Sequence, residues 1–246
     1  MDILAATILG LVAGLSGTML GGLFILYRSG NSLPRQGGLL GFSGGIMAAV
    51  VLFDLWPEAW HFGGFFPTLL GSGIGILMVQ FFDPMLQLIP WYRRRKFSKL
   101  TKVGILLGVG IGVHNFPEGV ALGTTFIASS RITEWLGLAL LMAIHNIPEG
   151  MVMASAFKIG RVGFGKIILA LTLVEVPMAL GGTAGGLLGK ISQWMIAVSL
   201  GFAGGAMALL VAKELLPLAK KFAGAFRVGC GFILGALVGI ALVSVV

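Results

Sequence analysis

Residues 103–129 read VGILLGVGIGVHNFPEGVALGTTFIAS, and this run decides how the chain must fold. It is long enough to cross the hydrocarbon core of a bilayer, which needs about 20 mostly apolar residues. Its only ionisable side chains are His114 and Glu118, and both stand near the middle of the run. Ionisable groups at mid-membrane are costly, so they usually face the interior of a helix bundle and serve a function. The run therefore predicts a membrane-spanning helix that carries part of a functional site.

The composition of the whole chain agrees with this prediction. Hydrophobic residues make up 57% of the 246 residues and charged residues only 11%, against about 25% charged residues in soluble domains. The length allows about eight spans of roughly 20 residues and leaves no room for a soluble domain. We therefore expect one transmembrane domain over residues 1–246, of the all-α polytopic class. The single cysteine, Cys230, permits no internal disulfide.

Eight apolar runs can be separated by their polar and basic connections. The predicted spans cover residues 3–27, 38–56, 66–89, 103–129, 134–157, 166–188, 193–216 and 226–246. Residues 57–64 are predicted to form a loop after Pro57, and residues 217–225 a basic loop before the last span.

The basic residues of these connections predict an orientation. Alternate loops place 15 of the 17 Lys and Arg residues on one side and leave Arg131 and Lys190 on the other. Cytoplasmic loops carry the excess of Lys and Arg in membrane proteins. We therefore expect a multi-pass protein of the cell membrane with both termini on the non-cytoplasmic side. The net charge of +8 lies in these loops, so we expect the partner to be the lipid bilayer and not nucleic acid.

A repeat links the second and seventh spans. Residues 41–48 read GFSGGIMA and residues 201–208 read GFAGGAMA, at an offset of 160, and Pro57 and Pro217 continue the match. The predicted topology makes the two copies antiparallel, as in the inverted repeats of secondary transporters. Glycine-rich packing helices of separate origin are the alternative. The shared Phe, Met and Pro positions favour a common origin.

A second repeat carries the candidate site. His114-Asn115-Phe116-Pro117-Glu118-Gly119 returns 31 residues later as His145-Asn146-Ile147-Pro148-Glu149-Gly150, near the middle of two antiparallel spans. The His and Glu of each motif are four residues apart and share a helix face, and the Asn and Glu are three apart. Imidazole and carboxylate together suit transition metals such as zinc and iron. A lone histidine would more often be a packing residue, but the doubled motif favours a metal site.

Prolines and further acidic residues complete the prediction. Pro117 and Pro148 each deprive a carbonyl in the preceding turn of its helical partner, which is tolerated at mid-membrane where the backbone lines a cavity. Glu175 is a further mid-span carboxylate, two residues before Pro177. Other polar residues near the span ends could line an entrance or exit that concentrates cations, although solvated helix ends explain them equally well. These residues are Asp54, Glu58 and His61 at one side, and Asp83 and Glu214 at the other.

The two HNxPEG motifs, Glu175 with Pro177, and the GFxGGxM segment together resemble the ZIP family of metal transporters over essentially the whole chain. The resemblance implies Zn²⁺ uptake into the cytoplasm, with tolerance for Fe²⁺, Mn²⁺, Co²⁺ or Cd²⁺. It also implies eight helices in a 3+2+3 arrangement, with helices 1–3 and 6–8 as an inverted repeat, frequently in a homodimer. Helices one, four, five and six would slide against the other four.

The resemblance also assigns two metal sites by motif. The first would use Met47, His114, Glu118, His145 and Glu149, and the second Asn115, Glu118, Asn146, Glu149 and Glu175. Two features depart from the family pattern. The loop after the third span is rich in arginine where many relatives carry histidines, and Lys213 precedes Glu214 where relatives often have consecutive acids.

Two other functions remain open at this point. An intramembrane metal-dependent hydrolase would need a motif such as HExxH, and the chain contains none. A cation channel without metal selectivity would use the same polar residues. On the transporter hypothesis no residue is catalytic and no catalytic cofactor is needed, because the metal is the substrate.

Overall fold

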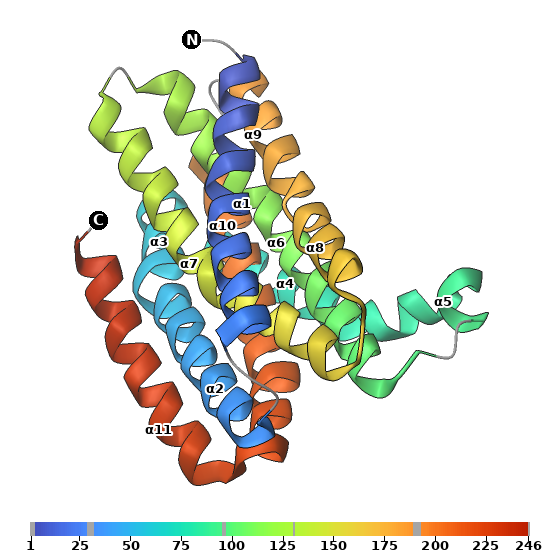
Figure 1. The fold of residues 1–246 in the computed structure, drawn as a ribbon. Helices are drawn as coiled ribbons and strands as arrows, with labels where there is room; N and C mark the ends of the chain where they lie inside the picture. The colour runs from blue at the N-terminus through green and yellow to red at the C-terminus, as the bar shows by residue number, and fades with distance from the viewer. Residues whose placement is uncertain (1–2, 29–31, 95–96, 130, 189–192, 246) are drawn as a thin grey trace.

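The computed structural model describes residues 3–28, 32–94, 97–129, 131–188 and 193–245, and these residues form helices with short connections and no strand. The long helices run side by side in a bundle, with the short α5 projecting from one side (Figure 1). In chain order the elements are α1 (Ile3–Arg28), α2 (Leu33–Val50), the π-helix η1 (Val51–Leu55), α3 (Trp56–Gly63), α4 (Phe65–Leu88), α5 (Pro90–Arg94), α6 (Lys99–Ala128), α7 (Ile132–Ile159), α8 (Phe164–Leu173), α9 (Val176–Leu188), α10 (Gln193–Leu210), the π-helix η2 (Val211–Leu215) and α11 (Leu216–Val245).

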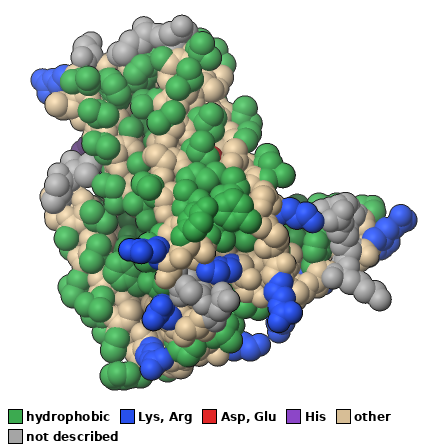
Figure 2. Space-filling model, in the orientation of Figure 1, with side chains coloured by type: hydrophobic (Ala, Val, Ile, Leu, Met, Phe, Trp, Pro, Cys, Tyr) green, Lys and Arg blue, Asp and Glu red, His purple; other side chains and the backbone are tan. Residues whose placement is uncertain are grey.

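Seven helical stretches among the described residues are long and apolar enough to cross a membrane. The prediction of an all-α polytopic membrane protein is therefore confirmed. The last stretch, Gln193–Ser244, is longer than one crossing and is interrupted at Gly224, whose φ of 73° and ψ of 163° are not helical. Hydrophobic side chains cover much of the visible face, and Lys and Arg side chains gather toward the lower end (Figure 2).

Two predicted loops are wrong, because the helices continue through them. Residues 57–63 are helical in α3, and residues 217–223 are helical in the first part of α11. In each case a π-helical turn directly precedes the proline, and the residue before the proline donates to a carbonyl five residues back: Trp56 to Val51, and Leu216 to Val211. The wider turn accommodates a proline that cannot donate its own hydrogen bond.

The repeat found in the sequence continues in the packing. Glycines of α2 lie against the backbone of α11, and their equivalents in α10 lie against α4. Gly45 lies against the carbonyl of Phe232, and Gly205 lies against the carbonyl of Ser72. The two glycines are 160 residues apart, and so are Ser72 and Phe232. The two π-helices and the two positive-φ glycines, Gly64 and Gly224, obey the same offset. Such agreement in contacts, bulges and breaks supports a common origin over separate glycine-rich helices.

The 160-residue repeat also relates α1 to the segment of α8 and α9, and these two differ in structure. α1 is continuous, whereas the equivalent segment is divided into α8 and α9 by turn residues at Val174 and Glu175. Pro177 stands just beyond this break and has no N–H for the preceding turn. The sequence had predicted one unbroken span over 166–188. In contrast, α6 and α7 stay continuous through Pro117 and Pro148.

Close backbone contact between α4 and α10 makes a direct prediction. A methyl group at Gly75 would overlap the carbonyl of Phe202, whereas Gly73 has open space around it. Gly75→Ala should lower the unfolding temperature of the detergent-solubilised protein, because overpacking costs about 1–3 kcal/mol. Gly73→Ala should leave it unchanged or raise it, because alanine favours helix over glycine by about 1 kcal/mol. Equal thermal stability of the two variants would contradict the packing described.

Candidate metal centre

The polar centre of the bundle lies between α6 and α7, where the two motifs face each other. His114 Nε2 lies 2.8 Å from Glu149 Oε1, and His145 Nε2 lies 3.2 Å from Glu118 Oε2. All four side chains are buried. Each imidazole is therefore paired with the carboxylate of the other helix. The two pairs are equivalent under the 31-residue offset of the motifs.

The ring orientation of His114 is set by the backbone. Its Nδ1 lies 3.0 Å from the carbonyl oxygen of Gly110. A carbonyl can only accept, so Nδ1 carries the proton and donates it. This contact directs Nε2 toward Glu149 and the interhelical space. The same device, a backbone acceptor on one ring nitrogen, orients histidines that bind metals through the other.

A second polar layer adjoins the first and involves α1 and the break between α8 and α9. The Asn115 amide donates to Glu175 Oε2 at 3.1 Å and to the carbonyl of Val174 at 3.2 Å. The Thr18 hydroxyl of α1 donates to Glu175 Oε1 at 2.5 Å. Glu175 is itself fully buried. The break between α8 and α9 thus leaves the Val174 carbonyl free to accept from Asn115, and Asn115 also bonds to Glu175.

Several buried oxygens of the centre have no hydrogen-bond donor among the residues that the structure describes. They are Asn115 Oδ1, Glu118 Oε1, Asn146 Oδ1 and Glu149 Oε2, and the ring nitrogen His145 Nδ1 is also without a partner. Buried polar atoms in proteins are nearly always satisfied, and leaving carboxylate oxygens bare in a low-dielectric interior is costly. With four oxygens that lack a donor beside two imidazoles, the centre is short of positive charge. A divalent cation is the chemical species that would supply it.

The glycine that ends each motif has a packing role. A methyl group at Gly119 would overlap the carbonyl of Met178 in α9, and one at Gly150 would overlap the carbonyl of Thr18 in α1. These glycines let α9 and α1 approach the motif helices closely. Gly14 of α1 serves the carboxylate itself, because a methyl group there would overlap Glu175 Oε2.

The polar side chains of the centre contact one another in pairs and do not surround a common ion position. Among the residues that the structure describes, no three His, Cys, Asp or Glu side chains group closely enough to enclose an ion. The predicted ligand Met47 is buried in the apolar cluster of α2, α10 and α11. Its repeat equivalent, Met207, lies in the same cluster. The structure therefore pairs His114 with Glu149, His145 with Glu118, and Asn115 with Glu175, and it places Met47 in an apolar cluster.

The residues predicted at one end lie on one helical segment. Glu58 lines a cavity of about 280 Å³ between α3 and the C-terminal end of α6. Asp54 lies about one helical turn before Glu58. Asp54 belongs to η1 and His61 to the last turn of α3, so all three lie on the helical segment that was predicted to be a loop.

The opposite end has a different character. Glu214 belongs to η2 and lines a cavity of about 630 Å³ together with four basic side chains. Asp83 lies in α4, but its side chain is outside the part of the structure that is described. The structure does not bring Glu214 into the polar centre.

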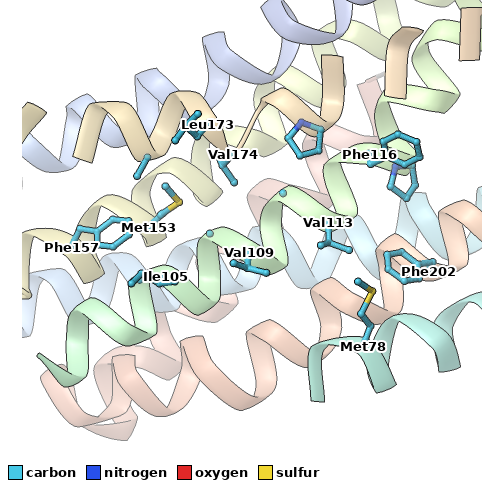
Figure 3. A pocket seen from close by; sticks show the side chains of 16 residues that line it. Met78, Ile105, Val109, Val113, Phe116, Met153, Phe157, Leu173, Val174 and Phe202 are labelled. Carbon is cyan, nitrogen blue, oxygen red and sulfur yellow. The ribbon is translucent and has the colours of Figure 1, made fainter. Parts of the chain in front are cut away.

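A further cavity of about 690 Å³ lies between α6 and α8, and Met78, Met153 and Phe202 also line it. Figure 3 shows the labelled side chains that surround it, and all of them are hydrophobic. Its lining contains no charged side chain, in contrast to the cavity that Glu58 lines.

Sequence reasoning missed Thr18, which donates to Glu175, and Met178, whose sulfur lies 3.8 Å from the Asn146 amide nitrogen. One signal was present, because Thr18 and Met178 occupy equivalent positions 160 residues apart. The predicted repeat covered only the second and seventh helices, so this equivalence went unused.

The chain resembles proteins of known function. No family model matches it. A zinc transporter ZupT of Escherichia fergusonii is 32% identical to it over 193 residues, which is 74% of each chain. A zinc transporter ZupT of Escherichia coli is 33% identical over 193 residues, again 74% of each. A zinc transporter ZupT of Shigella flexneri is 34% identical over 200 residues, with the same coverage.

The contact between α1 and Glu175 can be tested by metal binding. Gly14→Ala should displace the Glu175 carboxylate and weaken binding of Zn²⁺ or Cd²⁺ by about tenfold, the lower range seen when groups that orient metal ligands are changed. Isothermal titration of the purified protein measures this affinity. Gly22→Ala on the same helix is the control, because its methyl group would meet only the flexible end of Leu171. Unchanged affinity in Gly14→Ala would exclude Glu175 from the centre.

Proposed function

The chain belongs to the ZIP family of metal transporters, and on that premise we propose that it carries Zn²⁺ across the bilayer through the polar centre between α6 and α7. It is a membrane transporter of divalent metal ions and not an enzyme. The observation that carries the proposal is the set of buried carboxylate and amide oxygens without donors in both motifs. A transported cation supplies the positive charge that these atoms lack.

We propose two adjacent ion positions. The first uses His114, Glu118, His145 and Glu149, with Met47 as a further ligand. The second uses the asparagines Asn115 and Asn146 with Glu175, and shares Glu118 and Glu149 with the first. Entry of the ion would replace the two imidazole–carboxylate hydrogen bonds, since the same atoms serve as ligands. Neutral asparagine oxygens bind a cation more weakly than carboxylates, which favours release from the second position.

We further propose that the ion enters along Glu58, Asp54 and His61. Glu58 lines the cavity at the C-terminal end of α6, and Asp54 and His61 lie on the same helical segment as Glu58. Successive carboxylates raise the local concentration of a cation. The cavity that Glu214 lines is dominated by basic side chains, which repel a divalent cation, so we do not extend the path through Glu214. Asp83 remains a candidate for the exit.

The break at Gly224 suggests that Gln193–Ser244 makes two crossings, which gives eight in all. We propose the 3+2+3 arrangement, both termini outside the cytoplasm, uptake toward the basic side, and a homodimer in the cell membrane. The unit of α1, α6, α7, α8 and α9 would slide against a frame of α2, α3, α4, α10 and α11. The equivalent glycine contacts of α2 with α11 and of α10 with α4 support the frame as one packed body.

Uptake into proteoliposomes tests the assignment. Glu118→Gln and His145→Ala should each reduce the Zn²⁺ uptake rate by at least about tenfold, because each removes a ligand from the first position. Ser244→Ala, near the end of α11, should not change it. Wild-type uptake by both ligand variants would show that the centre is wrongly placed.

The same vesicles separate the competing functions. We expect Zn²⁺ uptake to be inhibited by excess Cd²⁺, Fe²⁺, Mn²⁺ or Co²⁺ but not by Ca²⁺, because imidazole ligands disfavour calcium. Equal passage of Ca²⁺ would indicate an unselective cation channel. Peptide cleavage without transport would indicate a hydrolase. Running the competition at several pH values would also show whether proton movement is coupled to uptake.

The proposed orientation can be measured with single cysteines in a Cys230→Ser background. A membrane-impermeant maleimide should label Arg131→Cys on intact cells, because this residue belongs to the side poor in basic residues. Lys220→Cys should be labelled only after permeabilisation, because it lies among the basic loops. The opposite pattern would invert the proposed topology.

A further inference from the structure

The cavity of about 630 Å³ at the N-terminal end of α6 is unusual for a cation transporter. Its wall contains Lys99, Arg161, Lys213 and Lys221, with Glu214 as the one acidic residue in the lining. The hydroxyl-bearing Ser98 also lines it. The four basic side chains are exposed and therefore accessible from water. The arrangement concentrates positive charge around a space within the roughly 300–1,000 Å³ range of small-molecule pockets.

The start of α6 adds to this positive charge. A helix N-terminus carries a partial positive charge and is stabilised by acidic residues in the first turn. α6 has none there, and its first residue is Lys99. The first-turn N–H groups of a helix have no partner within the helix and favour an anion nearby, although in α6 the Thr101 N–H is already taken by Ser98 Oγ. Lysine at this place opposes the ordinary charge preference, and a bound anion would relieve the repulsion.

The wall of the cavity is held in a defined shape. Ser98 Oγ accepts from the Thr101 N–H at 3.1 Å, and the Thr101 hydroxyl donates to the carbonyl of Gly160 at 3.4 Å. The next residue, Arg161, has a φ of 58° and is the positive-φ residue other than glycine among those described. A non-glycine residue in this conformation costs free energy. This connection fixes the turn after α7 against the start of α6 and brings Arg161 to the cavity.

The basic residues come from both sides of the proposed sliding interface. Lys99 and Arg161 belong to α6 and the turn after α7, whereas Lys213 and Lys221 belong to η2 and α11. Lys213 also donates to Gln80 of α4 at 3.1 Å, which attaches it to the frame. An anion in the cavity would therefore contact both bodies and hold them together.

We propose that this cavity is a binding site for a phosphate-bearing anion, either a soluble phosphate compound or the headgroup of an anionic lipid. Phosphate oxygens accept charge-assisted hydrogen bonds from Lys and Arg. The site is separate from the metal centre, and its occupancy favours the arrangement of the two bodies seen here.

Titration with pyrophosphate tests the site on the full chain in phosphatidylcholine nanodiscs and metal-free buffer. Wild-type protein should bind it and become more resistant to thermal unfolding. Lys99→Gln combined with Lys221→Gln should raise the Kd at least about tenfold, as expected for loss of charge-assisted hydrogen bonds. Lys166→Gln combined with Lys220→Gln is the matched control, because it removes the same charge from exposed lysines that do not line the cavity. This control should leave the Kd unchanged.

A second variant guards against loss of binding through misfolding. Glu214→Gln removes the opposing carboxylate and should tighten pyrophosphate binding by about fivefold, since a like charge near 4 Å costs this much even in water. A damaged protein cannot bind more tightly.

Nanodiscs that also contain phosphatidic acid distinguish the two sources of phosphate. Retention of phosphatidic acid in native mass spectrometry that depends on Lys99 and Lys221, without pyrophosphate binding, would identify a lipid headgroup as the ligand. Binding of pyrophosphate with the same dependence would identify a soluble ligand. If neither probe separates the Lys99 and Lys221 variant from its control, the proposed site does not exist.

Discussion

The crosswise pairing of two imidazoles with two carboxylates constrains the rest of the structure. These groups lie in a region where an unpaired charge is very costly, so each must meet its partner on the other helix. His114 reaches Glu149 and His145 reaches Glu118 only when α6 and α7 are antiparallel with their motifs at the same depth. The small residues of α1 and α9 follow from this requirement, because they let the neighbouring helices close over the centre.

Much of the fold could be predicted because apolar length and loop charge are local properties. Helices α1, α4 and α6 begin and end within four residues of the predicted runs 3–27, 66–89 and 103–129. The predicted loops after Pro57 and Pro217 were wrong, because proline was taken as a helix end. Each proline removes one helical hydrogen bond, and here the helix widens into a π-turn instead of ending. The break at Glu175 was missed because α6 and α7 continue through their prolines, so a proline alone does not predict a break.

The polar residues of the centre could be predicted because ionisable groups are rare within apolar spans. The partners of these residues could not. Thr18 is an ordinary residue in a glycine-rich helix, and only the packing of α1 against α8 and α9 reveals its hydrogen bond to Glu175. The role of Gly14 likewise depends on the distance between two helices. Side chains that carry charge are visible in a sequence, whereas the space left for them is not.

The repeat that relates α1 to the segment of α8 and α9 is not exact beside the polar centre. An exact repeat would place the same side chains at equivalent positions of both segments. The chain departs from symmetry where Glu175 occupies the position of Leu15, and Pro177 that of Gly17. The first change adds a carboxylate on one side only, and the second accompanies the break that frees the Val174 carbonyl for Asn115. Two substitutions thus convert a symmetric pair of half-sites into a centre with unequal ends.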